Sequence, residues 1–315
     1  MWREQNKQNG LAMRANRIAS KDNPAEANVP RIVNMPSRPY SVTQLAPSAS
    51  IAEALQRHWK EYLMEAAELA VLMFCICLFG TLLYSNASPI NRFGLSATGK
   101  ASLMGVAIAV ATCWIIRSPF GRRTGAHFNP AITIAYFYLG RVHRWDALCY
   151  VASQFTGALA GVFAAHQILG ERLSTPPVCY VITTPGYDGS LIAFVAEFAL
   201  SGLLMGVVLF ATNHRRLARF SPFIVALITV SYYAFCPSLS GFSVNPARSF
   251  SSAIFAWIWQ GIWVYFVAPC LGMLAAAFIY VSSEGRQEVY CAKVFHDLRS
   301  PCPFRCNFDR LYREH

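Results

Sequence analysis

The sequence predicts an all-α polytopic membrane protein with six transmembrane helices and two re-entrant half-helices, arranged as an inverted repeat. Hydrophobic residues make up 55% of the 315 residues and charged residues only 14%, whereas soluble domains carry about 25% charged residues. The apolar residues also form long continuous runs, and about 20 helical residues are needed to cross the hydrocarbon. Six runs are therefore expected to span the membrane: 64–84, 101–117, 146–169, 190–212, 221–238 and 261–282.

A repeated tripeptide relates the two halves of the chain. It comprises Asn129, Pro130 and Ala131 in the first half, and Asn245, Pro246 and Ala247 in the second. Each copy precedes a short apolar stretch, and about ten helical residues rise only ~15 Å, half of the hydrocarbon thickness. Three spans per half make the second half enter the membrane in the opposite sense, and such repeats place a site near the midplane. We therefore predict two half-helices that meet there with their N-termini.

The chemistry of the tripeptide suits such a meeting point. Asn is among the best N-cap residues, and Pro is favoured at the first helical position. When the side-chain oxygen caps the helix, the amide group of Asn129 or Asn245 can still donate hydrogen bonds. Each helix N-terminus also carries about half a positive charge. The sequence therefore predicts a path that offers hydrogen bonds to a passing oxygen atom and repels cations.

Composition divides the chain into three parts. Residues 1–60 are polar and are expected to form a disordered N-terminal tail, residues 61–283 form the membrane domain with repeats at about 61–170 and 190–283, and residues 284–315 form a Cys-rich C-terminal tail. Most of the 27 Lys and Arg residues lie in the tails and in the loops on the same side, which predicts that both termini are cytoplasmic. The net charge of +11 is therefore attributed to topology and contact with anionic lipid, and not to nucleic-acid binding.

In the segments GAHFNPA (125–131) and GFSVNPARS (241–249), and in a glutamate in the first span of each half, the sequence resembles the aquaporin (major intrinsic protein) family. The resemblance covers roughly residues 60 to 283. It implies passive conduction of water or small neutral solutes, no enzymatic activity, a multi-pass location in the plasma membrane, and a homotetramer in which each protomer has its own pore.

The resemblance also implies a constriction, formed by Met104, Tyr233, Phe242 and Arg248. The guanidinium of Arg248 would offer fixed donors and a permanent positive charge, although an Arg at a helix end can also snorkel to the interface. Met104 is assigned by aligning the SLMG pattern, because the loop that follows this span looks too long by a few residues for a direct count.

Tyr233 and Phe242 would narrow the path, which favours water over glycerol, unless Tyr233 points into the core. The alternatives are a channel for glycerol, ammonia or hydrogen peroxide, an ion-coupled secondary transporter, and a non-conducting scaffold protein.

Acidic residues inside the spans have two interpretations. The resemblance implies that Glu68 and Glu197 are structural and hold backbone N–H groups of the re-entrant loops, whereas proton coupling is the rival interpretation. Spacing alone does not decide whether Glu65 takes the place of Glu68. His127 is expected to be either a packed loop histidine or a pH-sensitive gate.

Ten cysteines occur in the chain, and most are expected to be small apolar core residues. Four soft ligands gather near the C-terminus: Cys291, His296, Cys302 and Cys306. They are suited to a structural Zn²⁺ site of the Cys3His type, although they lack the CxxC spacing of a zinc knuckle. A disulfide is disfavoured on the cytoplasmic side. No other cofactor is expected.

Overall fold

The computed structural model describes residues 48–235, 240–297 and 299–313. Residues 1–47 of the predicted N-terminal tail lie outside the described part. The prediction of disorder was wrong for residues 51–60, because helix α2 (Ile51–Tyr84) begins there. Charged residues made this segment too polar to be recognised by hydropathy. A capping motif does mark its start, since Ser50 Oγ accepts from the Glu53 N–H and the Glu53 carboxylate accepts from the Ala49 N–H.

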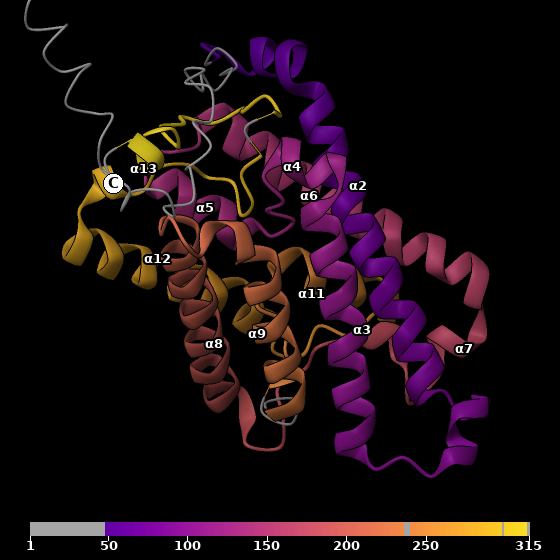
Figure 1. The fold of residues 1–315 in the computed structure, drawn as a ribbon. Coiled ribbons are helices and arrows are strands. Elements are labelled where there is room, and N and C mark those ends of the chain that lie inside the picture. Colours follow the sequence, from indigo (N-terminus) through magenta and orange to yellow (C-terminus); the bar gives the residue numbers. More distant parts are fainter. Residues whose placement is uncertain (1–47, 236–239, 298, 314–315) are drawn as a thin grey trace, which may run out of the picture. The chain divides into compact units, whose positions relative to one another are not determined.

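Each predicted span contains a helix (Figure 1). The six helices are α2, α3 (Ala97–Arg117), α6 (Arg144–Leu169), α8 (Gly189–Thr212), α9 (Ser221–Phe235) and α12 (Ile262–Glu284). Five are long and apolar enough to cross a membrane, whereas α9 has 15 residues and ends directly before the undescribed residues 236–239. Together with the absence of strands from the described residues, these helices confirm the all-α polytopic class.

Two half-helices, α5 (Pro130–Tyr138) and α11 (Pro246–Ala256), follow the Asn-Pro-Ala tripeptides. The remaining elements are short: α4 (Pro119–Thr124), α7 (Glu171–Ser174), α13 (Arg310–Arg313), and the 3-10 helices η2 (Pro89–Phe93), η3 (Cys179–Val181), η4 (Ala218–Phe220) and η5 (Arg286–Glu288). At 9 and 11 residues, α5 and α11 rise about 14 and 16 Å, roughly half of the hydrocarbon thickness.

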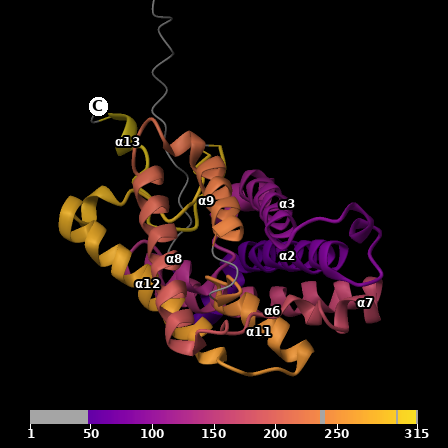
Figure 2. The ribbon, with the colours of Figure 1, turned by 90° about the horizontal axis from the view of Figure 1, so that it is seen from below.

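The helices of the two halves pair in the same way. Helix α2 packs along α6 in the first half, α8 packs along α12 in the second, and α3 packs against α9. Seen from below in Figure 2, α2, α3 and α6 lie on one side and α8, α9 and α12 on the other. The first helix of each half therefore packs along the third helix of the same half, as the inverted repeat predicts.

Glycines make the two intra-repeat pairs close. A Cβ atom at Gly157 or Gly161 of α6 would overlap the carbonyl oxygen of Ala66 or Ala70 in α2, and a Cβ at Gly272 of α12 would overlap the α8 backbone. Small residues are favoured at such crossings, because in lipid the attraction between helices comes from close backbone packing. The predicted GxxxG face on α6 is thus the face in contact with α2.

Large apolar side chains cover the outward faces of the helices. Among them are Val110, Trp114, Leu191 and Ile279, each of which is more than 60% exposed. A soluble monomer rarely leaves such extensive apolar surface in water. These faces are therefore suited to lipid, and the polar side chains that the fold buries lie on the opposite, inner faces.

Candidate functional site

The two asparagines of the tripeptides cap the half-helices. Asn129 Oδ1 accepts from the Ala131 N–H at 2.9 Å, and Asn245 Oδ1 accepts from the N–H groups of Ala247 at 3.1 Å and Arg248 at 3.3 Å. Each cap satisfies N–H groups that the first helical turn leaves without a partner. Both side-chain oxygens are thereby fixed, so the direction of each side-chain amide group is fixed as well.

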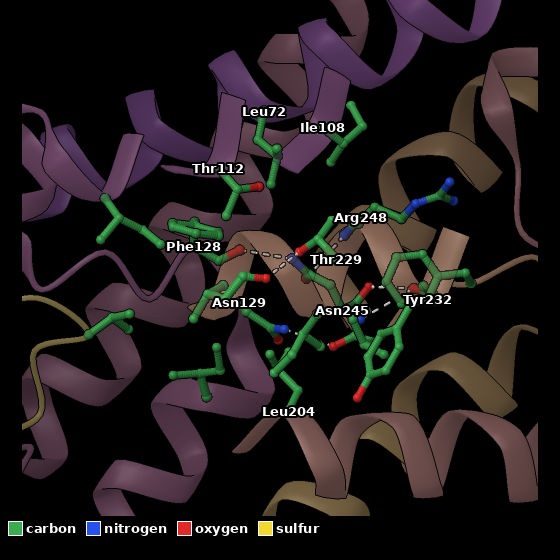
Figure 3. A pocket seen from close by; sticks show the side chains of 18 of the residues that line it. Leu72, Ile108, Thr112, Phe128, Asn129, Leu204, Thr229, Tyr232, Asn245 and Arg248 are labelled. Carbon is green, nitrogen blue, oxygen red and sulfur yellow. Dashed lines mark hydrogen bonds between the residues drawn. The ribbon is translucent and has the colours of Figure 1, made fainter. Parts of the chain in front are cut away.

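The amide groups join the two half-helices at their tips. Asn129 Nδ2 donates to the Val244 carbonyl oxygen at 2.7 Å, and Asn245 Nδ2 donates to the Phe128 carbonyl oxygen at 2.8 Å (Figure 3). Each Asn thus binds the residue that precedes the other Asn. An amide nitrogen carries two hydrogens, so one N–H of each Asn remains for a molecule in the adjoining cavity, which both residues line.

Both loops that lead into the half-helices use the same unusual backbone. The third and the first residue before each Asn have positive φ: Ala126 at 56° and Phe128 at 30° in one loop, and Phe242 at 50° and Val244 at 48° in the other. This conformation costs an L-residue roughly 1–2 kcal/mol, and it persists only where surrounding contacts hold it. The repeat therefore extends to single backbone torsions.

Buried acids hold these loops. Glu197 of α8 accepts from the N–H groups of Ser243 at 2.8 Å and Val244 at 2.6 Å, and from the Ser240 hydroxyl at 2.7 Å. Bonds from N–H groups to a carboxylate are stronger than bonds between neutral groups. They offset the cost of the strained torsion at Val244, which makes Glu197 part of the scaffold.

In the first half this role belongs to Glu65, so the assignment of loop N–H binding to Glu68 was wrong. Glu65 Oε1 accepts from the Phe128 N–H at 2.5 Å, whereas Glu68 Oε1 accepts only from the Thr124 hydroxyl, at 2.7 Å, among the described residues. Thr124 and Ser240 lie five residues before their respective Asn. Glu197 binds both the Ser240 hydroxyl and the loop N–H groups. In the first half these two roles are divided, since Glu68 binds the Thr124 hydroxyl and Glu65 binds the Phe128 N–H.

Sequence reasoning also missed Gln154 of α6. Its Nε2 donates to Glu65 Oε1 at 2.7 Å and to Thr133 Oγ1 at 3.0 Å, and the residue is fully buried. It binds the same carboxylate oxygen of Glu65 that accepts from the Phe128 N–H. A polar residue in the middle of an apolar span is the signal that could have revealed it, because such residues seldom lie in lipid.

A narrow central cavity of about 90 Å³ runs past the two tips. Most of its wall is apolar, contributed by residues such as Leu72, Ile108, Ile132, Leu204 and Val208. The polar groups come from the capping asparagines, Arg248 and a few hydroxyl-bearing side chains. An apolar wall with a few placed donors binds a permeant molecule weakly at several points, which conduction requires.

Three of the four residues predicted for the constriction line this cavity. Tyr233 and Phe242 meet edge to face with ring centroids 4.8 Å apart, and Arg248 lines the same cavity. Met104 is buried but does not line it, and Ile108, one helical turn further along α3, does. The structure therefore does not bring Met104 to the cavity wall.

Arg248 is held inside the protein. The residue is only 4% exposed, and its Nη1 has no hydrogen-bond partner among the described residues. Figure 3 shows its side chain at one end of the group of cavity-lining residues. A snorkelling Arg would instead place its guanidinium in water, so the geometry favours an internal donor.

His127 is a packed loop residue. Its Nε2 lies 2.7 Å from the Ala292 carbonyl oxygen and its Nδ1 lies 3.1 Å from Thr133 Oγ1. The ring is stacked against Phe304 at 5.1 Å and Tyr136 at 5.2 Å between centroids, and the residue is fully buried. These contacts leave no exposed ring atom for a gate that responds to solvent pH.

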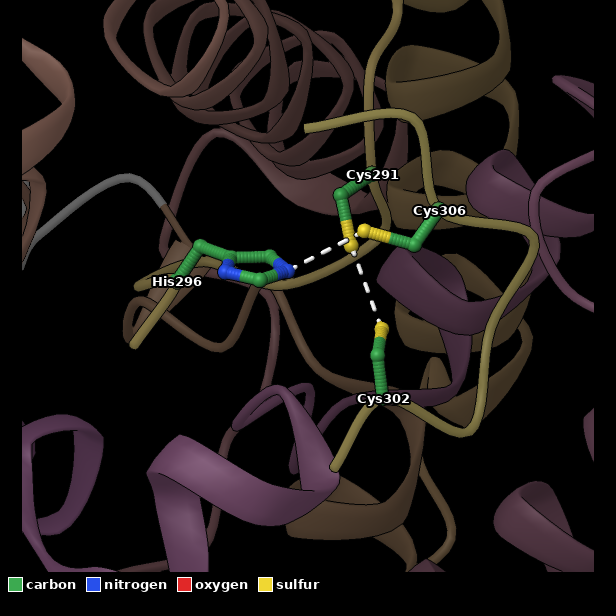
Figure 4. Close-up of side chains that lie close together, drawn as sticks. All are labelled: Cys291, His296, Cys302 and Cys306. Atoms are coloured by element: carbon green, nitrogen blue, oxygen red, sulfur yellow. Dashed lines mark hydrogen bonds between the residues drawn. The ribbon is translucent and has the colours of Figure 1, made fainter. Parts of the chain in front are cut away.

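The four soft ligands near the C-terminus converge. One ligand atom from each of Cys291, His296, Cys302 and Cys306 lies within 4.8 Å of all the others (Figure 4). The three cysteines are buried and His296 is half-buried. The cluster lies on the C-terminal segment (residues 289–313, apart from residue 298), at one end of the helices (Figure 1). Backbone N–H groups of this segment donate to Gly125, which caps α4, and to Arg141, just after α5.

Two inverted three-helix repeats, with half-helices that meet beside a narrow cavity, define a polytopic membrane protein of the channel type. Residues 53–280 match the family described as Major intrinsic protein. The match covers more than half of the chain, so this protein belongs to that family, whose members are channels and not enzymes.

Two relatives and one solved structure illustrate the likeness. Probable aquaporin NIP4-2 of Arabidopsis thaliana is 35% identical over 161 residues, which cover 51% of this chain and 55% of that protein. Aquaporin NIP2-2 of Zea mays is 27% identical over 243 residues, 76% of each chain. The chain thus spans between about half and three quarters of these relatives. The X-ray structure of the aquaglyceroporin from Plasmodium falciparum has the same fold, with a TM-score of 0.60, 21% identity, and coverage of 73% of this chain and 98% of that one.

Proposed function

We propose that this protein is a passive water channel that excludes ions and protons. The observation that carries the proposal is the meeting of Tyr233 and Phe242, whose rings lie 4.8 Å apart in the wall of the cavity that Arg248 also lines. Two aromatic rings and a buried guanidinium narrow the path, which favours a permeant of the size of water. A glycerol molecule needs a wider opening, so we propose that water passes and glycerol is excluded.

Exclusion of cations follows from the charges that face the cavity. Both half-helices point their positive N-terminal ends at it, each equivalent to about half a charge, and Arg248 adds a full charge. No acidic residue is among the described residues that line the cavity. A cation or hydronium ion would therefore lose its hydration without gaining a counter-charge.

The acids support a channel more than an ion-coupled transporter. Coupling needs a carboxylate or an unwound carbonyl that binds the ion. Glu65 and Glu197 instead accept backbone N–H groups of the two loops, which engages them in the scaffold. The alternative permeants are therefore the small neutral solutes glycerol, ammonia and hydrogen peroxide. Ion-coupled transport is the less favoured alternative.

The positive-inside distribution supports cytoplasmic termini, and we propose a location in the plasma membrane. We also propose that the chain forms a homotetramer with one pore in each protomer. The apolar outer faces of the helices support contact with lipid or with neighbouring protomers. Chemical cross-linking in native membranes, resolved by gel electrophoresis, would give a four-step ladder, whereas a ladder ending at two would contradict the tetramer.

Selectivity is tested by stopped-flow light scattering of proteoliposomes that contain the full chain. An impermeant osmolyte reports water permeability, and a glycerol gradient reports glycerol uptake. We expect water permeability well above that of protein-free vesicles and glycerol uptake equal to theirs. Equal acceleration of both permeants would refute the water selectivity, and glycerol uptake without water flow would favour the alternative.

A further inference from the structure

The C-terminal segment reaches the central cavity. Val294 lines the same cavity as Asn129 and Asn245, although it lies ten residues beyond the end of α12. Its N–H donates to the Gly125 carbonyl oxygen at 3.0 Å, and its carbonyl oxygen accepts from the Ser221 hydroxyl at 2.5 Å. The segment is therefore held between the loop before α5 and the start of α9, beside the cavity.

Neighbouring residues fix the segment further. The Ala292 carbonyl oxygen contacts His127 Nε2 at 2.7 Å, the Lys293 ammonium donates to the Arg122 carbonyl oxygen, and Phe304 stacks on the His127 ring. All these partners belong to α4 or to the loop that leads into α5. The segment is thus a folded part of the protein, tied to the loop whose residues Ala126 and Phe128 also line the cavity.

The soft-ligand cluster brackets the residue that lines the cavity. Val294 lies between Cys291 and His296, and Cys302 and Cys306 come from the returning chain. Sγ of Cys291 lies 3.5 Å from Sγ of Cys302, and His296 Nε2 lies 3.1 Å from Cys306 Sγ. Zinc with sulfur ligands at about 2.3 Å in a tetrahedron separates two sulfurs by about 3.8 Å. All four ligand atoms lie within 4.8 Å of one another, so shifts of up to about 1 Å would complete the site.

The charge next to the cluster points to a metal as well. Lys293 is fully buried, and its ammonium donates to two carbonyl oxygens, those of Arg122 and Pro301. No carboxylate pairs with it among the described residues. A buried charge without a counter-charge is costly. Three thiolates and one neutral imidazole around Zn²⁺ carry a net charge of −1, which would compensate this ammonium.

We propose that Cys291, His296, Cys302 and Cys306 bind a structural Zn²⁺ ion that holds Val294 at the mouth of the cavity and so partly closes the pore on that side, which lowers its water permeability without abolishing it. The ion ties the two ends of the Cys291–His296 stretch to the returning chain. Without it, the stretch loses the link that keeps Val294 in place, and the mouth opens. The closure rests on the proposed water channel, whereas the metal site does not.

The metal site is tested on the purified full chain by elemental analysis. We expect about one zinc per chain in the wild type and in Cys113→Ser, a half-buried cysteine of α3 outside the cluster, and far less in Cys302→Ser. Replacement of zinc by Co²⁺ should give thiolate-to-cobalt absorption bands in the wild type and in Cys113→Ser. Equal zinc content in Cys302→Ser, or a Cys291–Cys302 disulfide found by mass spectrometry in metal-free protein, would overturn the site.

The closure is tested by water permeability of proteoliposomes. Removal of zinc with a membrane-permeant chelator should raise the permeability several-fold, and readdition of zinc should restore it. Val294→Ala, which leaves all four ligands in place, should raise the permeability while its zinc content stays at one per chain. Unchanged permeability after verified zinc loss and in Val294→Ala would overturn the closure, and water flow above that of protein-free vesicles in the same samples would show that the channel itself is intact.

Discussion

The side-chain amide of Asn129 donates to the carbonyl oxygen of Val244 at 2.7 Å, and this bond ties the tip of one half-helix to the loop of the other. The reciprocal bond from Asn245 completes a pair across the pseudo-symmetric centre. Because each Asn also caps its own helix, one residue type fixes the helix start, the opposite loop and a donor beside the cavity.

Replacing Asn129 by Asp tests the cross-link. Asn129→Asp keeps an oxygen for the cap but removes the amide donor and places a carboxylate beside the Val244 carbonyl oxygen. An unmade buried hydrogen bond costs about 1–3 kcal/mol, so we expect a lower thermal unfolding temperature in detergent and reduced water permeability. The control is Asn86→Asp in an exposed loop. A variant that unfolds and conducts like the control would show that the bond contributes nothing.

Glu65 and Glu68 can be compared to test whether binding a loop N–H group, and not burial of the acid alone, stabilises the protein. Glu65→Gln weakens the bond to the strained Phe128 N–H, whereas Glu68→Gln affects only a hydroxyl partner among the described residues. Bonds to charged groups contribute about 1.5–3 kcal/mol, so we expect the larger loss of thermal stability in Glu65→Gln. Both residues are buried in the same helix, which makes Glu68→Gln the matched control. A larger loss in Glu68→Gln would return the role to that residue.

The glycines of α6 test the close helix crossing. A methyl group at Gly157 would meet the Ala66 carbonyl oxygen, whereas the space beside Gly206 of α8 is open. Because alanine favours a helix by about 1 kcal/mol over glycine, Gly206→Ala should be neutral or stabilising. Gly157→Ala should lower the unfolding temperature and the yield of folded protein. Equal behaviour of the two variants in a thermal unfolding assay would argue against tight packing of α2 on α6.

Tyr233 is expected to set the width of the path. Tyr233→Gly removes one of the two rings that meet at the cavity wall, so glycerol uptake by proteoliposomes should rise several-fold. Tyr280→Gly, in helix α12 and outside the cavity lining, carries the same cost of a helical glycine and should leave glycerol uptake unchanged. If Tyr233→Gly stays closed to glycerol while water flow persists, Tyr233 does not determine the width.

The membrane class and the half-helices could be predicted because they follow from strong local signals. Long apolar runs give the spans, and Asn-Pro pairs mark helix starts through their own backbone chemistry. The beginning of α2 was missed because its first turns are charged. Its capping motif at Ser50 and Glu53 was present in the sequence, so the start was readable without the structure.

The assignments of Glu68 and Met104 differ from the structure because the sequence does not show which side of a helix faces the loops or the cavity. Glu65 and Glu68 lie one turn apart, and only the position of the Phe128 N–H distinguishes them. Ile108, one turn along α3, lines the cavity and Met104 does not. The long loop after α3 contains α4, so counting back from the first Asn-Pro-Ala motif does not fix which residue of α3 faces the cavity. The packing of the C-terminal segment on the pore had no sequence signal beyond the Cys and His residues, because Val294 contacts residues more than seventy positions away.

Water is proposed to pass beside the tips joined by Asn129 and Asn245. The most direct measurement is osmotic shrinkage of proteoliposomes at several temperatures, with a pH-sensitive dye inside to report proton flow. For the wild type and Val294→Ala we expect faster shrinkage than for protein-free vesicles, a weak temperature dependence, and no added proton flow. Shrinkage at the rate of protein-free vesicles in both proteins, or water flow accompanied by protons, would contradict a proton-excluding water path at this place.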